Sequence, residues 1–160
     1  MRKTATTINP ALSRVISETG HTDLLVVTDA GLPIPPGSER IDLAYRPGAP
    51  AFFDVLDTVL AELVVEGATV SAEVAEKSPE VLAALRERFA DQDFEIELIP
   101  HVEFKKLTHS ARAFVRSGEF TPYANVILHA GVAYLSLIHI SEPPTRLLSI
   151  SYAVFCLKKK

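Results

Sequence analysis

Short apolar runs alternate with amphipathic helical stripes along most of this sequence, and this alternation restricts the possible fold more than any other feature. Asn9 and Pro10 form a helix N-cap and first helical position, and apolar residues at helical spacing continue towards Gly20, the expected helix end. The next run, Leu24–Thr28, is rich in β-branched apolar residues, as in a strand that is buried on both faces. The pattern predicts an α/β fold with a single domain, layered α/β/α, and a mostly parallel sheet.

The same signals predict the remaining elements. Further helices are expected at residues 52–63, 79–89 and 102–109, the second of them after an N-cap at Ser78. Further strands are expected at residues 41–45, 69–74, 94–98, 114–116 and 126–128. Residues 30–37 contain three prolines and two glycines, so they are expected to form a loop. Ligands of such sheets bind beyond the carboxyl ends of the strands, where we expect Asp29 and His101.

Charge and composition argue against several classes of protein. The net charge is −4 and the only cationic run is Lys158–Lys160, which argues against nucleic acid as a partner. The single cysteine, Cys156, gives neither a disulfide framework nor metal-ligand spacing, and it fits a reducing compartment. No secretory signal precedes Pro10, and the longest apolar stretch, Leu147–Leu157, has about half of the ~20 residues that a spanning helix needs. We therefore expect a cytoplasmic protein with no membrane partner.

Two residues near the amino terminus are candidates for chemistry, but each has an ordinary structural interpretation as well. A histidine in a turn, such as His21, commonly serves as a cap or is solvated, and an aspartate after a strand, such as Asp29, commonly caps a turn. A metal site formed by His21, Asp23 and Asp29 matches no established ligand spacing, so no metal is expected. No Gly-rich phosphate loop or nucleophile elbow is present, which argues against kinases, dehydrogenases and hydrolases.

The later candidates are equally ambiguous when they are taken singly. His101, like His109 and His129, is interpreted either as a ligand-binding residue or as a surface or packed histidine. In the turn Tyr123-Ala124-Asn125, Asn commonly bonds its own backbone and Tyr supplies a packed ring. Position alone therefore does not assign a function to these residues.

Five motifs taken together give a specific signal, because they resemble the D-ribose pyranase family in content, order and spacing. The resemblance covers about residues 1–134. In the related L-fucose mutarotases the loop after the strand aspartate usually reads Asn-Phe-Pro, where this chain has Gly31-Leu32-Pro33, so ribose is favoured over fucose. The motifs are Gly20-His21-Thr22-Asp23, the segment from Thr28 to Pro35, Arg40-Ile41-Asp42, Arg116-Ser117-Gly118-Glu119 and Pro122-Tyr123-Ala124-Asn125.

This resemblance implies an enzyme that interconverts the pyranose and furanose forms of D-ribose, without a cofactor, in ribose utilisation. It also implies a ring-shaped homodecamer whose sugar sites lie near subunit contacts. The residues it implies are His21 as proton donor, with Asp29, His101, Tyr123, Ala124 and Asn125 binding the sugar. Ring opening delivers one proton to the ring oxygen and removes one from the anomeric hydroxyl, and an imidazole can perform either transfer.

Two other functions remain as alternatives, namely an L-fucose mutarotase and a non-catalytic sugar-binding module on the same scaffold. A binding module needs the contacts of Asp29 and of the Tyr123–Asn125 turn, but it needs no residue that moves protons. An intact His21 therefore favours the enzyme.

The resemblance ends near Tyr134, which predicts a pyranase-like domain at residues 1–134 and a non-family tail at residues 135–160. The tail, especially the stretch from Ser141 through Lys160, resembles translated sequencing adapter, so we interpret it as an artefact. The alternative is a genuine C-terminal extension that binds a partner or a membrane surface through its basic end.

Overall fold

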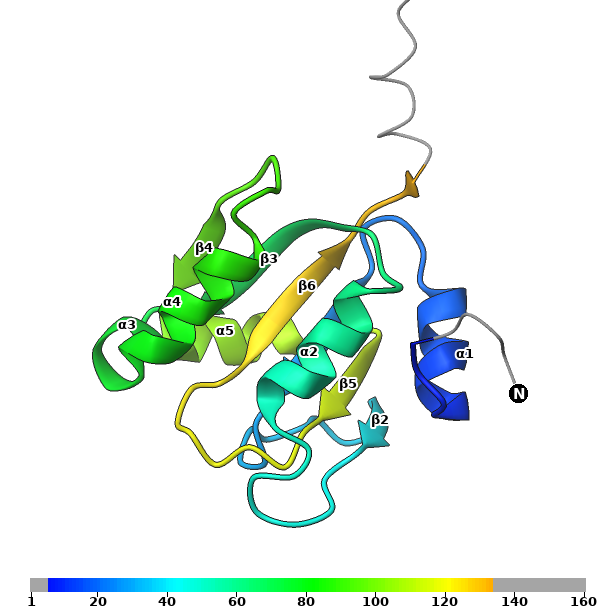
Figure 1. Cartoon of the computed structure of the whole chain (residues 1–160), viewed down its shortest axis with the longest axis horizontal. Helices are drawn as coiled ribbons and strands as arrows, with labels where there is room; N and C mark the ends of the chain where they lie inside the picture. The colour runs from blue at the N-terminus through cyan, green and yellow to red at the C-terminus, as the bar shows by residue number, and fades with distance from the viewer. Residues whose placement is uncertain (1–5, 134–160) are drawn as a thin grey trace, which may run out of the picture.

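A six-stranded sheet forms the centre of the computed structural model, which describes residues 6–133 (Figure 1). The strands lie in the order β2-β5-β1-β6-β3-β4. Their bounds are β1 (Leu24–Thr28), β2 (Glu39–Asp42), β3 (Val65–Ser71), β4 (Ile96–Ile99), β5 (Ala113–Arg116) and β6 (Val126–Ala130). The helices are α1 (Pro10–Glu18), α2 (Phe52–Leu60), α3 (Val74–Lys77), α4 (Pro79–Arg88) and α5 (His101–Thr108).

One strand, β6, runs against all the others. The pairs β1–β5, β2–β5 and β3–β4 are parallel, whereas β6 is antiparallel to its neighbours β1 and β3. The prediction of a mostly parallel sheet is therefore confirmed, with β6 as the exception. Because β6 is reversed, its first residues lie at the same edge of the sheet as the last residues of the other strands.

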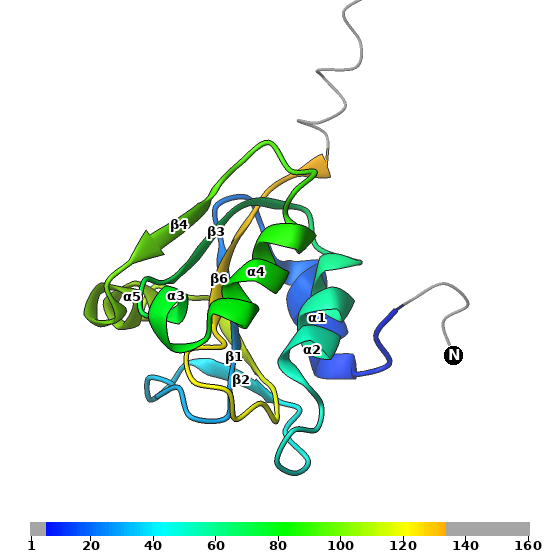
Figure 2. The same cartoon turned by 60° about the vertical axis from the view of Figure 1, so that its left-hand side comes forward.

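Helices cover both faces of the sheet, as the layered prediction requires (Figure 2). On one face, α1, α2 and α4 pack through buried side chains such as Leu12, Phe52 and Leu85. On the other face, Phe104 of α5 packs in a smaller cluster with strand residues and the loop after β1. Within β1 the side chains alternate between the two clusters, so this strand is buried on both faces, as its composition predicts.

Several element boundaries differ from those expected. The second strand covers Glu39–Asp42 rather than 41–45, because its pairing with β5 begins at the charged residue Glu39 on an exposed edge. The third strand, β3, ends at Ser71, and Val74 belongs to α3 instead. These strands pair through backbone groups, so their ends are set by the partner strand rather than by their own apolar pattern.

The predicted helix caps are only partly confirmed. Asn9 caps α1 as expected, because its side-chain oxygen accepts a hydrogen bond from the Leu12 N–H at 2.9 Å. Ser78 stands at the N-cap position of α4 as expected, but its side chain makes no capping bond; its hydroxyl donates instead to the carbonyl of Pro122 at 2.7 Å. The helix end expected at Gly20 comes earlier, at Glu18, and in the following turn Thr22 takes the left-handed conformation with φ 71°. Both corrections concern residues beside the candidate motifs.

Candidate functional site

A cleft of about 320 Å³ opens at the edge of the sheet where β1 and β4 end and β6 begins. This volume lies near the lower end of the range of roughly 300–1,000 Å³ that small-molecule sites occupy. The cleft is lined by residues from the loop after β1, the start of α5 and the turn before β6, namely Asp29, Gly31, Leu32, Pro33, His101, Lys105, Pro122, Tyr123 and Asn125. Four of the expected site residues therefore meet in one place, although nearly 100 residues separate the first from the last.

Asp29 and Asn125 form a reciprocal pair at the base of this cleft. The Asp29 N–H donates to Asn125 Oδ1 at 2.9 Å, and Asn125 Nδ2 donates to Asp29 Oδ2 at 2.8 Å. Asp29 Oδ1 also accepts from the N–H groups of Gly31 and Leu32, both at 2.8 Å. Both side chains are buried, at 9% and 2% exposure. The Asp29 carboxylate, which can accept about four bonds, retains one free acceptor position, and the Asn125 amide nitrogen, which can donate two, retains one free donor.

A second set of contacts fixes the loop that follows Asp29. Arg116 pairs with Asp42 at 2.9 Å, and its Nη2 donates to the carbonyl of Ala30, also at 2.9 Å. Ser117 donates from its hydroxyl to the carbonyl of Thr28 at 2.7 Å. The motifs at residues 40–42 and 116–119 therefore act as a scaffold that holds the cleft loop against β5.

Gly118 allows this scaffold to pack closely. A Cβ at Gly118 would lie 2.3 Å from the carbonyl oxygen of Ala49, which no side chain permits. The Gly118 N–H donates to the carbonyl of Pro50 at 2.9 Å, so the two backbone segments lie directly against each other. Only glycine fits at this position of the motif.

Glu119 organises the turn that carries Tyr123. Its Oε1 accepts hydrogen bonds from the N–H of Phe120 and from both the N–H and the hydroxyl of Thr121. Burial favours the protonated form of this carboxyl, but the hydrogen bonds from Thr121, Phe52 and Phe120 outweigh it and lower the pKa of Glu119. The turn is therefore built around an ionised carboxylate at neutral pH.

The ring of Tyr123 lies edge-on against the ring of His101, with centroids 5.0 Å apart and an interplanar angle of 82°. Tyr123 has φ 61°, a left-handed conformation that is uncommon for a residue with a bulky side chain. His101 also stacks on Phe104 at 6.2 Å, and its Nδ1 is buried without a hydrogen-bond partner among the described residues. An unsatisfied ring nitrogen beside the cleft is a group that a ligand hydroxyl can satisfy.

Burial and three charged neighbours determine the environment of His101. Burial lowers the pKa of His101, and the positive charge of Lys105 lowers it further, against opposing contributions from Glu73 and Asp29. The Glu73 carboxylate accepts from the His101 N–H at 3.0 Å and so holds the first turn of α5. Hydrogen bonds from Ser71 and from His101 lower the pKa of Glu73. His101 is therefore neutral near pH 7 and can both donate and accept hydrogen bonds.

His21 does not lie at this cleft within the same chain. It occupies the turn before β1, whereas Asp29 follows the other end of that strand. Five residues of β1 separate the two ends, roughly 16 Å at about 3.3 Å per residue. His21 is exposed, and its Nε2 lies 3.0 Å from Glu66 Oε2. A single chain therefore brings together the expected binding residues but not the expected proton donor.

The remaining candidates lie outside the cleft. Ala124 is buried in the larger core cluster, so only its backbone can face a ligand. His129 bonds Thr69 at 2.8 Å within the sheet, and His109 is exposed at the end of α5.

Within residues 6–133, no group of three or more potential ligand residues could hold a metal ion, and no helix is long and apolar enough to cross a membrane. Cys156 and the tail from residue 135 lie outside the described residues.

Sequence reasoning missed Lys105, Glu73 and Glu66, and it included Glu119 only as part of a motif, without a role of its own. Lys105 lies one helical turn after His101, so helical spacing alone could have found it once α5 was known to begin at His101. Glu73 and Glu66 act through contacts across 28 and 45 residues of sequence. No local pattern indicates such contacts.

Comparisons with known proteins point to one family. Residues 1–133 match the RbsD / FucU transport protein family. A D-ribose pyranase from Symbiobacterium thermophilum is 52% identical over 134 residues, which is 84% of this chain and 100% of that protein.

Solved structures agree with this match. The structure of Bacillus subtilis RbsD complexed with D-ribose has a TM-score of 0.78 at 45% identity and covers 82% of this chain and 98% of its own. A fucose mutarotase from Streptococcus pneumoniae, solved with L-fucose, has a TM-score of 0.70 at 24% identity, covering 82% and 99%. At that identity the second structure supports the fold alone.

Proposed function

The chain belongs to the RbsD / FucU family, and on that premise we infer that it is a D-ribose pyranase, an intramolecular sugar isomerase that interconverts the pyranose and furanose forms of D-ribose. The observation that carries this inference is the agreement between relatives named for this activity and a cleft whose polar lining suits a monosaccharide. Polar groups converge there from three segments, as in small-molecule sites generally.

Ribose is favoured over fucose as the substrate by the degree of similarity. The relative solved with D-ribose is 45% identical, whereas the one solved with L-fucose is 24% identical. The loop Gly31-Leu32-Pro33, on which the sequence-based preference for ribose over fucose rests, forms one wall of the cleft. The Asp29 carboxylate accepts hydrogen bonds from the N–H groups of Gly31 and Leu32, the first two residues of this loop. The loop therefore helps to fix the position of the aspartate.

The side chains of the cleft suggest separate roles. Asp29 and Asn125 each have one remaining hydrogen-bonding position for a sugar hydroxyl, and the buried Nδ1 of His101 is available for another. Tyr123 offers a hydroxyl and a ring edge, and Ala124 offers backbone atoms only. We expect these groups to hold the sugar without themselves exchanging its protons.

His21 is the proton donor in this proposal, and it acts on a sugar held in the cleft of a neighbouring subunit. The distance along β1 keeps His21 away from its own cleft, so a second protomer must bring the two together. Val102 and Phe120, next to His101 and near Tyr123, are 65% and 68% exposed. Apolar side chains of this size beside a cleft favour a subunit contact there.

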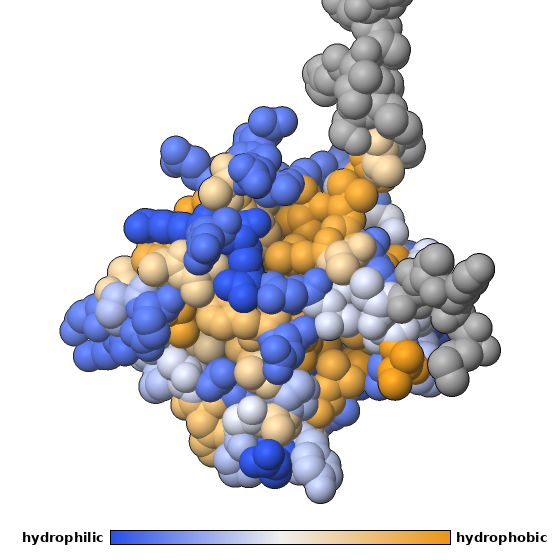
Figure 3. Space-filling model, viewed as in Figure 1, coloured by the Kyte–Doolittle hydropathy of each residue, from blue (hydrophilic) through white to orange (hydrophobic). Residues whose placement is uncertain are grey.

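The proposed assembly is a homodecamer. Figure 3 shows apolar side chains reaching the surface beside α2 and α4, on the face away from α5. Phe53, Leu60 and Phe94, which lie on or near these helices, are only partly buried, and Val64 is 43% exposed. Such surfaces are typical of proteins that associate. The size of the ring itself rests on the family resemblance.

We propose a cytoplasmic location, D-ribose as the small-molecule partner, and no cofactor, nucleic acid or membrane partner. Residues 135–160 stay outside the proposed enzyme domain, in line with a family match that ends at residue 133. A chain that ends at Tyr134 should therefore retain its sugar-exchange activity, and loss of assembly on truncation would assign the tail a function.

A saturation-transfer NMR measurement tests the proposed function. The exchange rate between pyranose and furanose ribose should rise in proportion to enzyme concentration, with a smaller effect on L-fucose at the same concentration. His21→Ala should abolish the acceleration while sugar binding persists, because the cleft residues are unchanged. A protein that binds ribose without changing its exchange rate would instead be a binding module. Faster exchange of fucose than of ribose would make it a fucose mutarotase.

A further inference from the structure

Strand β3 contains a bulge at Glu66. In the ladder with β6, Val65 pairs with Ala130 and Gly67 pairs with His129, so Glu66 is an additional residue without a partner of its own. A bulge of this kind redirects a side chain out of the regular alternation, and bulges are common next to active sites. The redirected side chain of Glu66 meets His21, which is 45 residues away in the sequence.

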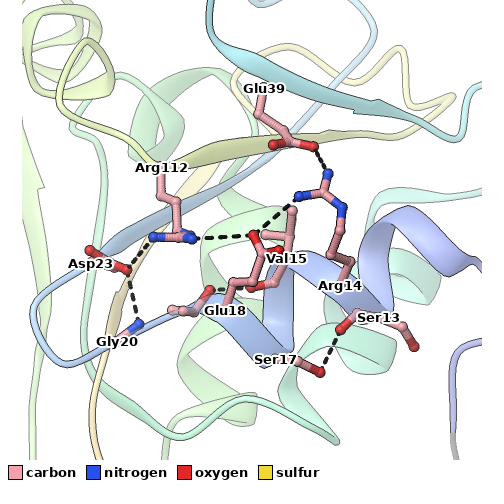
Figure 4. Close-up of polar contacts among 10 residues, drawn as sticks. Ser13, Arg14, Val15, Ser17, Glu18, Gly20, Asp23, Glu39 and Arg112 are labelled. Atoms are coloured by element: carbon pink, nitrogen blue, oxygen red, sulfur yellow. Dashed lines mark hydrogen bonds and ion pairs between the residues drawn. The ribbon is translucent and has the colours of Figure 1, made fainter.

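The turn that carries His21 is fixed independently of this contact. The N–H of Thr22 donates to the carbonyl of Ala130 at 3.0 Å. Asp23 Oδ2 accepts from the Gly20 N–H at 2.9 Å and pairs with Arg112 at 3.2 Å, which in turn pairs with Glu18 (Figure 4). The backbone at His21 is therefore held by β6 and α1, and Glu66 is left to determine the orientation of the ring.

The contact between Glu66 and His21 has a chemical consequence. A carboxylate can only accept hydrogen bonds, so the Nε2 that lies 3.0 Å from Glu66 must carry a proton. In the neutral ring the other nitrogen, Nδ1, is then the unprotonated one. Within residues 6–133, Nδ1 of His21 has no hydrogen-bond partner. It is the ring nitrogen that is free to meet a substrate.

We propose that Glu66 is a positioning residue that holds His21 in the Nε2-protonated tautomer, so that Nδ1 exchanges protons with the sugar. This inference rests on the proposed role of His21. In the step it serves, the imidazolium passes its Nδ1 proton to the ring oxygen as the bond between that oxygen and the anomeric carbon breaks. The anomeric hydroxyl loses its proton to solvent as the carbonyl forms, so no net charge or electron change results. The neutral ring that remains is the tautomer that Glu66 binds.

Stability does not explain this pair. The two side chains are 45% and 41% exposed, and exposed ion pairs contribute little to folding. Replacing Glu66 should therefore leave the thermal midpoint nearly unchanged while it affects catalysis. A merely structural role would give the opposite result.

The experiment compares Glu66→Leu and Glu66→Gln with the wild type and with Glu87→Gln, a control at an exposed position on α4. Solid-state NMR of the full chain, labelled with ¹⁵N-histidine, reports the tautomer of each ring, and the spectrum of His21→Ala identifies the His21 signals. We expect the Nε2-protonated form to dominate in the wild type and to lose its dominance in Glu66→Leu. The kcat for ribose exchange should fall at least about tenfold in Glu66→Leu with KM nearly unchanged. This loss is a part of the roughly 10²- to 10⁴-fold that general acid–base catalysis supplies.

Glu66→Gln keeps the size of the side chain but can also donate to Nε2, so we expect an intermediate kcat. An unchanged kcat in either Glu66 variant would overturn the proposal, as would a lower kcat in Glu66→Leu with an unchanged tautomer. If Glu66→Leu does not assemble, the kcat and the tautomer of Glu66→Gln alone test the proposal. Failure of the proposed function is distinguishable, because the wild type itself would then not accelerate ribose exchange. Failure of the proposed role of His21 would instead leave His21→Ala fully active.

Discussion

At the scale of single residues, the buried pair of Asp29 and Asn125 sets the geometry of the cleft. Asp29 faces three donors, two from its own loop and one from Asn125. Its interpretation as a turn cap and its interpretation as a ligand-binding residue are therefore compatible, since capping aims the carboxylate towards the cleft. Asn125 connects this loop to the start of β6 and so joins the two halves of the site.

Asn125→Asp tests this pair without a change of size. The substitution replaces the donor at 2.8 Å from Asp29 Oδ2 by a second oxygen in a buried place. We expect a loss of about 1–3 kcal/mol of stability at neutral pH, because a buried group loses its hydrogen bond and gains a like-charged neighbour. The loss should become smaller on acidification, as the two carboxyls come to share a proton. Thermal denaturation across pH measures both effects, and an unchanged midpoint at neutral pH would contradict the geometry.

Three groups of the site predict how stability depends on pH. The pKa of His101 is lowered by burial and by Lys105, and hydrogen bonds lower the pKa values of Glu73 and, against burial, of Glu119. A lowered folded-state pKa gives stability that is complete above the unfolded value and is lost as pH falls through the folded value. Stability should therefore decline first below about pH 6.5, the ordinary histidine value, and again below about pH 4.5, the ordinary glutamate value.

The matching variant is His101→Gln, which cannot titrate. It should remove the decline of the thermal midpoint below about pH 6.5 and keep the decline at lower pH. His109→Gln is the control, because that histidine is exposed at the end of α5. If the control rather than His101→Gln flattened the upper part of the profile, the environment described for His101 would be wrong.

At the scale of elements, the site depends on the reversal of β6. Asp29 and His101 follow strand ends, as their sequence context predicts, but Asn125 precedes a strand. It reaches the same edge only because β6 is antiparallel to β1. Strand direction depends on pairing between distant segments, so no local pattern of apolar residues could predict it.

The scaffold around the cleft is the second determinant at this scale. Gly118→Ala should destabilise the protein by about 1–3 kcal/mol or more, because the new methyl group overlaps backbone atoms of Ala49 that cannot move aside. The exposed turn residue Gly37 has φ 83° but no neighbour within 4 Å, so Gly37→Ala is a control for backbone strain without overlap. Chemical denaturation compares the two. A smaller loss at Gly118 than at Gly37 would contradict the close packing.

Helices α1, α2, α4 and α5 and the central strand were predictable from sequence, whereas the short helix α3 and the charged edge were not. β1 was predicted with its observed bounds because its five consecutive residues are suited to burial on both faces of the sheet. β2 was displaced because Glu39 and Arg40 pair with β5 while their side chains remain in solvent. Ser78 carries a typical cap sequence, yet its hydroxyl bonds Pro122, since a contact across the fold replaced the local one.

At the scale of the whole molecule, the chain separates its binding residues from its proton donor. The five motifs identified the family, but only the fold shows that four of the expected residues line one cleft, and it places His21 at the opposite edge of the sheet. The eight positions between His21 and Asp29 suggest proximity, but the strand predicted between them, Leu24–Thr28, already places the two residues at its opposite ends. The proposed mechanism therefore requires assembly, because only a neighbouring subunit can bring His21 to the cleft. Burial of exposed apolar surface is a second, separate reason for the subunits to associate.

Mixed assemblies of two inactive variants test this central claim most directly. His21→Ala lacks the donor and His101→Ala lacks a cleft residue, and each should be inactive as a pure assembly. If His21 acts on the cleft of a neighbour, random mixing of equal amounts restores about a quarter of the sites, because an intact cleft then meets an intact His21. Saturation-transfer NMR with D-ribose should show this recovery after co-expression and none after simple mixing of assemblies that do not exchange subunits. Co-expressed assemblies that contain both chains and remain inactive would contradict the account.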